Sequence, residues 1–355
     1  MSPLNALTRE DLPLLKEFRE VGLLQHREAD FASHSTSLSL PFIETLGKID
    51  SMRDLAINIV SDVDLGLPFQ WSHLTVLKLS VSRSSLGCVS FVQRVSQLCP
   101  LLVECTLLVP YRDTTIDPLS TGQHQVSQEW AHLRKLDITL SGPSNSSVEE
   151  TVFHLFESIT TPSLTHLSLC LNCFPVPGHD APFYHSGRGL SFHNLIARSH
   201  CKLTELDLNI PLPESLGDTL DLLPSLTALT LDTVPSDDET SFDLIFRTLT
   251  SHPARCRNVR TLAITSCHPR DSLPLVDLIE SRRRDSDLTL FRANFATFPS
   301  SSADIRVLEV ALEVAKSREL GVDIRWEYVR QNFPDIRDSP YPFIESPLDV
   351  LTPTP

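Results

Sequence analysis

The stretch LPSLTALTL, residues 223–231, decides the fold of this chain. It places Leu226, Leu229 and Leu231 in the pattern LxxLxL, and a related phrase, LPLLKEFRE, stands at residues 12–20. Side chains alternate between the two faces of a β-strand, so Leu229 and Leu231 point to one face and the residues beside them point to the other. The stretch therefore predicts a short strand with one buried face.

The LxxLxL pattern recurs about nine times along the chain. The copies are Leu74, Leu77 and Leu79; Leu102, Cys105 and Leu107; Leu133, Leu136 and Ile138; Leu164, Leu167 and Leu169; Leu203, Leu206 and Leu208; Leu226, Leu229 and Leu231; Val259, Leu262 and Ile264; and, more weakly, Leu15 with Phe18, and Met52 with Leu55 and Ile57. Successive copies begin 22 to 39 residues apart. This spacing spans and exceeds the roughly 20 to 29 residues of a leucine-rich repeat, which indicates insertions between some repeats.

The segments between the copies have the apolar period of a helix. Two such stripes consist of Cys88, Phe91, Val92, Val95, Leu98 and Cys99, and of Val148, Val152, Leu155, Phe156 and Ile159. Ser147 and Glu150 form a capping box at the start of the second stripe. The predicted repeating unit is therefore strand, turn, helix, turn.

A single unit of this kind cannot fold alone. Ordering its backbone costs on the order of 1 to 2 kcal/mol per residue, whereas each buried leucine contributes only about 1.5 to 3 kcal/mol. Stacking solves the problem, because each leucine then packs against its equivalents in the neighbouring coils. We therefore expect an α/β fold of the leucine-rich-repeat solenoid type, with about nine degenerate repeats, a curved parallel sheet on the concave side and helices on the convex side.

The pattern changes after Ser272, and the C-terminal part reads as a helix, a strand in DLTLFRANF, a long amphipathic helix in ADIRVLEVALEVAKSREL and a closing strand in GVDIRWEYV. We interpret this part as a terminal coil that covers the last leucines. The predicted organisation is a single domain over residues 1–335, with irregular coils at 1–70, main repeats at 71–270 and a capping coil at 271–335, followed by a flexible proline-rich tail at 336–355.

Composition narrows the class of function. The chain has 355 residues with 30 basic and 45 acidic side chains, so its net charge of −15 repels nucleic-acid backbones. It contains no apolar run of the roughly 18 residues that a membrane helix needs, and its first residues do not read as an export signal. We therefore expect a cytoplasmic or nuclear protein with reduced cysteines, and neither nucleic acid nor membrane as a partner.

No catalytic or cofactor-binding motif is present. The chain has eleven glycines and contains no GxxxxGK[ST] loop, no GxGxxG fingerprint and no GxSxG elbow. We therefore expect no cofactor and a non-catalytic protein.

The candidate binding site consists of the strand positions that alternate with the leucines and face the concave side. The residues are Lys78, Thr106, Lys135, Asp137, His166, Ser168, Glu205, Asp207, Asn209, Thr230 and Asp232. They form a polar, mildly acidic set that could meet a basic segment of a protein partner. The alternative is that they are ordinary solvent-facing strand residues without a ligand.

A second candidate site is the histidine-rich insertion between residues 172 and 193. The run GHDAPFYHSGRGLSFH places His179, Asp180, His185 and His193 close together in sequence. If these side chains converged, the chain could be a metal-binding or hydrolytic protein. The alternative is an exposed loop in which the histidines occur by chance, and no metal ligand is assigned.

Several phrases resemble a known family. The run LPLVDLIESRRRD, the strand and helix that follow it and the phrase LGVDIRWE look like the C-terminal end of basidiomycete F-box-like proteins with degenerate leucine-rich repeats. The phrases WSHLTVLKLS and LCPLLVECTLLV are similar to the middle of that family. The resemblance covers about residues 10 to 330 and implies the substrate-recognition region of an F-box subunit of a cullin-type ubiquitin ligase.

The resemblance has one departure. Members of that family usually begin with an F-box, a helical segment that docks a Skp1-type adaptor, and we do not find this segment here. A Skp1-type adaptor is therefore expected as a partner only if an F-box exists outside this chain. The protein that the repeats would bind is not predicted by the resemblance.

Overall fold

The protein is an α/β structure built on a large parallel sheet. The structure is a computed structural model that describes residues 16–19, 46, 49–61, 69–83, 88–110, 128–143, 154–174, 192–210, 216–232, 246, 249–250, 257–267, 277–278, 281, 288–295 and 321–326. Within these residues, eleven strands form one sheet in the order β1-β2-β3-β4-β6-β8-β9-β10-β11-β12-β13. Every neighbouring pair is parallel. Because β1 and β13 stand at opposite ends of this order, the sheet is open and is not a closed barrel.

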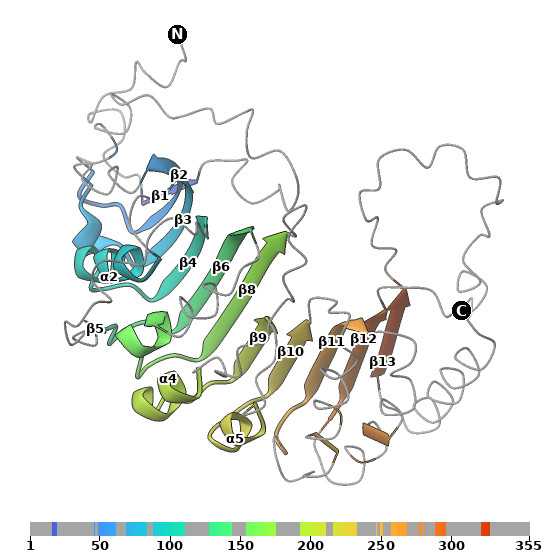
Figure 1. Cartoon of the computed structure of the whole chain (residues 1–355). Helices are drawn as coiled ribbons and strands as arrows, with labels where there is room; N and C mark the ends of the chain where they lie inside the picture. The colour runs from blue at the N-terminus through green and yellow to red at the C-terminus, as the bar shows by residue number, and fades with distance from the viewer. Residues whose placement is uncertain are drawn as a thin grey trace, which may run out of the picture.

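The strands follow one another in chain order, as the colour gradient in Figure 1 shows. Their bounds are β1 Glu17–Arg19, β2 Asp54–Ser61, β3 Val76–Arg83, β4 Glu104–Pro110, β6 Lys135–Pro143, β8 His166–Phe174, β9 Glu205–Asn209, β10 Ala228–Asp232, β11 Thr261–Cys267, β12 Leu290–Phe295 and β13 Gly321–Trp326. A separate two-stranded sheet pairs β5 Gln128–Glu129 with β7 Ile159–Thr160. The strands expected in DLTLFRANF and GVDIRWEYV are confirmed as β12 and β13.

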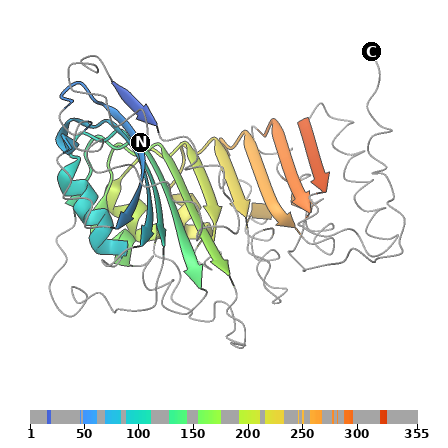
Figure 2. The ribbon, with the colours of Figure 1, turned by 90° about the horizontal axis from the view of Figure 1, so that it is seen from above.

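The helices lie along one side of the large sheet (Figures 1 and 2). They are α2 Cys88–Leu98, α4 Phe192–Ser199 and α5 Leu216–Asp221, with a short 3-10 helix, η4, at Trp71–His73. The helix expected from the Cys88 stripe is confirmed as α2. One residue of the second stripe was wrongly predicted: Ile159 is buried as expected but lies in β7, because the chain leaves the helical conformation after Ser158 and pairs with β5.

The register of the sheet follows the LxxLxL pattern. The second apolar position of each LxxLxL copy is the first that lies in its strand, and it is a register partner of the same position in the neighbouring strand. These residues form one column across the sheet: Phe18, Leu55, Leu77, Cys105, Leu136, Leu167, Leu206, Leu229 and Leu262. The second strand positions form a parallel column that runs from Ile57 to Ile264. The alignment predicted from the sequence is therefore confirmed for these strands.

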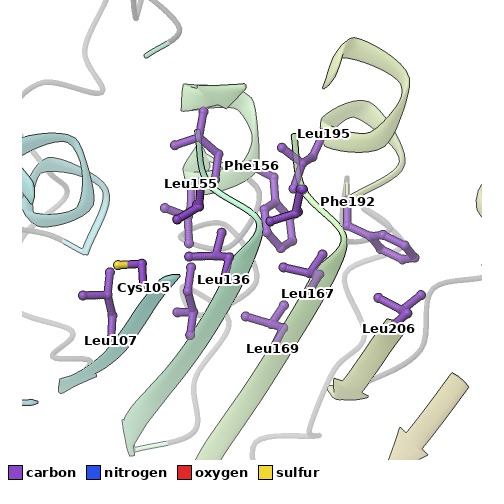
Figure 3. Close-up of a cluster of buried hydrophobic side chains, with 14 of the residues drawn as sticks. Cys105, Leu107, Leu136, Leu155, Phe156, Leu167, Leu169, Phe192, Leu195 and Leu206 are labelled. Carbon is purple, nitrogen blue, oxygen red and sulfur yellow. The ribbon is translucent and has the colours of Figure 1, made fainter. Parts of the chain in front are cut away.

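The side chains of these two columns form the part of one continuous hydrophobic core that the sheet contributes. From Leu55 to Ile264 every member of both columns is buried, and most are 0 to 2% exposed. Figure 3 shows Leu136, Leu167 and Leu206 side by side on adjacent strands, with Leu155, Phe156, Phe192 and Leu195 lying over them from the helical side. Each of these strands therefore shares its apolar surface with the next one.

The backbone repeats one hydrogen-bond arrangement at the entry to each strand. The amide groups of Thr165 and His166 both donate to the carbonyl of Arg134, at 2.8 and 2.9 Å. Equivalent pairs link the coils from Lys16 to Leu290 without a break in the described strands. This repeated geometry fixes the spacing of the coils.

Threonines reinforce this ladder with their hydroxyl groups. The hydroxyl donates to a carbonyl in the preceding coil at Thr75 (3.3 Å to Arg53), Thr165 (3.0 Å to Arg134), Thr204 (3.0 Å to Thr165), Thr227 (3.0 Å to Thr204) and Thr289 (3.1 Å to Arg260). The same residue type at the same position makes the same bond each time.

Other expectations fall on parts of the chain that the structure does not describe. They are the long helix within residues 303–320, the capping box at Ser147 and Glu150, and the tail at 336–355. The proposed domain boundaries also stay predictions. Among the helices in the described ranges, none combines the length and apolarity needed to cross a bilayer.

Candidate functional site

All eleven residues of the predicted binding site lie on one side of the sheet, opposite the helices. We call this set of residues the polar face. Lys78 lies on β3, Thr106 on β4, Lys135 and Asp137 on β6, His166 and Ser168 on β8, Glu205, Asp207 and Asn209 on β9, and Thr230 and Asp232 on β10. All eleven are half-buried or exposed, whereas the leucines between them are buried. Alternation along the strands produces this separation of polar and apolar side chains.

The residues of the polar face form three rows across the strands. The middle row contains consecutive register partners, namely Lys78, Thr106, Asp137, Ser168, Asp207 and Thr230. One flanking row contains Lys135, His166 and Glu205, and the other contains Asn209 and Asp232. Neighbouring strands lie about 4.8 Å apart, so adjacent members of a row are within reach of each other.

Polar contacts connect the middle row from strand to strand. Thr106 Oγ1 donates to Asp137 Oδ2 at 3.2 Å, and Lys135 Nζ lies 3.4 Å from the same oxygen. Ser168 Oγ donates to Asp207 Oδ2 at 3.4 Å. Exposed contacts of this kind contribute only about 0 to 1 kcal/mol each, so their main effect is to orient the side chains.

His166 has two polar side-chain contacts on the polar face. Its Nε2 lies 3.0 Å from Glu205 Oε1, and its Nδ1 lies 2.8 Å from Thr165 Oγ1. The ring therefore links β8 to β9 on one side and contacts the threonine ladder on the other. Both His166 and Glu205 keep substantial exposure, with 37% and 57% of their side chains accessible.

The charge of the polar face is unevenly distributed. Across β6 to β10, one lysine, Lys135, faces four carboxylates, at Asp137, Glu205, Asp207 and Asp232. Lys135 pairs with Asp137, so the acidic character is concentrated on β9 and β10. A surface of this kind attracts cationic groups and repels anionic ones.

The buried cysteines do not offer nucleophiles. Cys105 takes the place of a leucine in the first column, and Cys99 is buried beside α2. Burial raises the pKa of the Cys99 thiol to about 12, and burial together with the nearby Cys99 and Asp137 raises the pKa of the Cys105 thiol well above its usual range. Both stay protonated, unreactive thiols at neutral pH.

The histidine-rich insertion is only partly within the described residues. His179, Asp180 and His185 lie outside them, so their convergence stays a prediction. His193 is half-buried on α4, where its Nδ1 lies 3.3 Å from Thr219 Oγ1. In the described part of the chain, no group of three or more His, Cys, Asp or Glu residues is arranged to hold a metal ion.

Two features of the sheet were not predicted from the sequence. The middle row continues at register positions Ala263, Arg292 and Asp323 on β11, β12 and β13. The strands β4, β6 and β8 also extend past the motif and add a third buried column at Val109, Leu140 and Leu171. The signal was available, because LFRANF and DITLSG continue the apolar alternation beyond the three motif positions.

The comparisons with known proteins add no further identification. No family model matches the sequence, and a search of curated proteins found no significant match. The function is therefore inferred from the sequence pattern and from the geometry of the polar face.

Proposed function

We propose that this chain is a leucine-rich-repeat solenoid of about nine degenerate repeats with the polar face on its concave side. Its proposed function is non-catalytic protein–protein interaction. The observation that carries the proposal is the alignment of Asp207 with Thr230 and of Asn209 with Asp232 on adjacent strands, which forms an acidic, half-exposed patch next to Glu205. We propose that this patch binds a basic segment of another protein.

The supporting physical argument is preorganisation. The strands that hold the polar face are fixed by the backbone ladder and by the buried leucine columns on their other side. A surface that is already ordered loses little conformational entropy when it binds, which favours affinity. Asp207 on β9 and Asp232 on β10 lie on adjacent strands, and carboxylates placed in this way also suit an extended segment that carries cationic side chains.

The family resemblance extends this proposal. If the chain belongs with the basidiomycete F-box-like proteins, the polar face corresponds to the target-recognition region of a ubiquitin-ligase subunit. A Skp1-type adaptor would then be a partner only through an F-box outside this chain. The proposed environment is the cytoplasm or the nucleus, with neither nucleic acid nor membrane as a partner.

Charge reversal on the polar face tests the proposal. The test variant carries Asp137→Lys, Glu205→Lys and Asp207→Lys, and a matched control carries Glu129→Lys, Asp221→Lys and Asp277→Lys, which are exposed positions on other elements. Affinity capture followed by mass spectrometry should identify a partner that binds the wild type and the control but is lost from the test variant. Circular dichroism checks that both variants are folded. A partner that binds all three proteins equally would contradict the proposed binding face.

A further inference from the structure

We draw no further inference here: the strongest candidate, the cluster of acidic side chains on β9 and β10 beside the small side chains of β10 and β11, belongs to the polar face already described, and no second observation in the described part of the chain indicates a ligand for it.

Discussion

Leu206 and Asp207 are neighbours in the chain with opposite surroundings. Leu206 is 1% exposed and packs in the first leucine column, whereas Asp207 is exposed on the polar face. The difference follows from the alternation of side chains along β9. At the scale of the residue, the inward side chains of this strand therefore stabilise the fold, and its outward side chains form the polar face.

Truncation of a column leucine tests this separation. Leu206→Ala should lower the free energy of unfolding by about 2 to 5 kcal/mol, because it removes buried contacts and leaves a cavity between two coils. Leu222→Ala is the matched control, since that leucine is 41% exposed and its truncation should change stability by less than about 0.5 kcal/mol. Urea denaturation followed by circular dichroism measures both values. Equal losses in the two variants would mean that the register is wrong.

The buried thiols give a second test at the residue scale. Burial raises the pKa of Cys99 to about 12 and raises that of Cys105 well above its usual range, so neither thiol ionises appreciably at neutral pH. Alkylation with iodoacetamide should leave both unmodified in the native protein and should reach them only in denaturant. Cys170, which is partly exposed on the polar face, serves as the reactive reference. Peptide mass spectrometry reads the modification, and rapid native labelling of Cys105 would contradict its place in the core.

At the scale of the element, polar side chains of α4 connect this helix to the segment before it, and Arg198 makes several of these contacts. Arg198 on α4 donates to the carbonyl groups of Phe156 and Ile159 and lies 3.4 Å from Glu157 Oε2. Asn194 of the same helix donates to Glu157 Oε1 at 2.6 Å. The arginine thus satisfies carbonyl groups that the end of the preceding helical segment leaves without an intrahelical donor.

Removal of this arginine tests the connection between coils. Arg198→Ala should lower the free energy of unfolding by about 1 to 3 kcal/mol, because partly buried carbonyl groups lose a charged donor. Hydrogen exchange should also become faster in residues 154–160. The control is Arg94→Ala, an exposed position on α2. Unchanged exchange in that segment would show that Arg198 does not hold it.

The sequence predicted the strands better than the connections between them. Each LxxLxL copy predicts its own strand, because the alternation of leucines is local information. The contacts of Arg198 with residues 156 and 159 and the pairing of β5 with β7 join segments about 30 to 40 residues apart. No local pattern contains such partners, so the loss of helix at Ile159 and the role of Arg198 could not be predicted.

At the scale of the whole molecule, the copies of the short LxxLxL motif align from strand to strand and form one continuous sheet. The first leucine column passes through nine strands and the second through eight, and each strand shares its buried surface with its neighbours. If the chain is the proposed solenoid, its stability is a sum of interactions between adjacent repeats. The positions of the polar face follow from the same register, which is why the sequence predicted which residues share that face.

The contacts within the polar face were beyond sequence reasoning. Which of two neighbouring carboxylates His166 contacts depends on the register between β8 and β9 and on side-chain conformation. The threonine ladder also joins residues that are 23 to 39 positions apart in the sequence, at Thr165, Thr204 and Thr227. The side-chain contacts of the polar face therefore depend on how the strands are assembled into the sheet.

Disulfide trapping across neighbouring strands tests the register of the sheet most directly. Asp207→Cys with Thr230→Cys, and Thr106→Cys with Asp137→Cys, place cysteines at register partners, about 4.8 Å apart and within the reach of a disulfide. Lys78→Cys with Asp207→Cys is the control, since these positions share a row but stand four strands apart, roughly 19 Å. Mild oxidation and peptide mass spectrometry should detect cross-links in both register pairs and none in the control. Cross-links that fail in the register pairs, or that form equally in the distant pair, would contradict the parallel sheet on which the polar face depends.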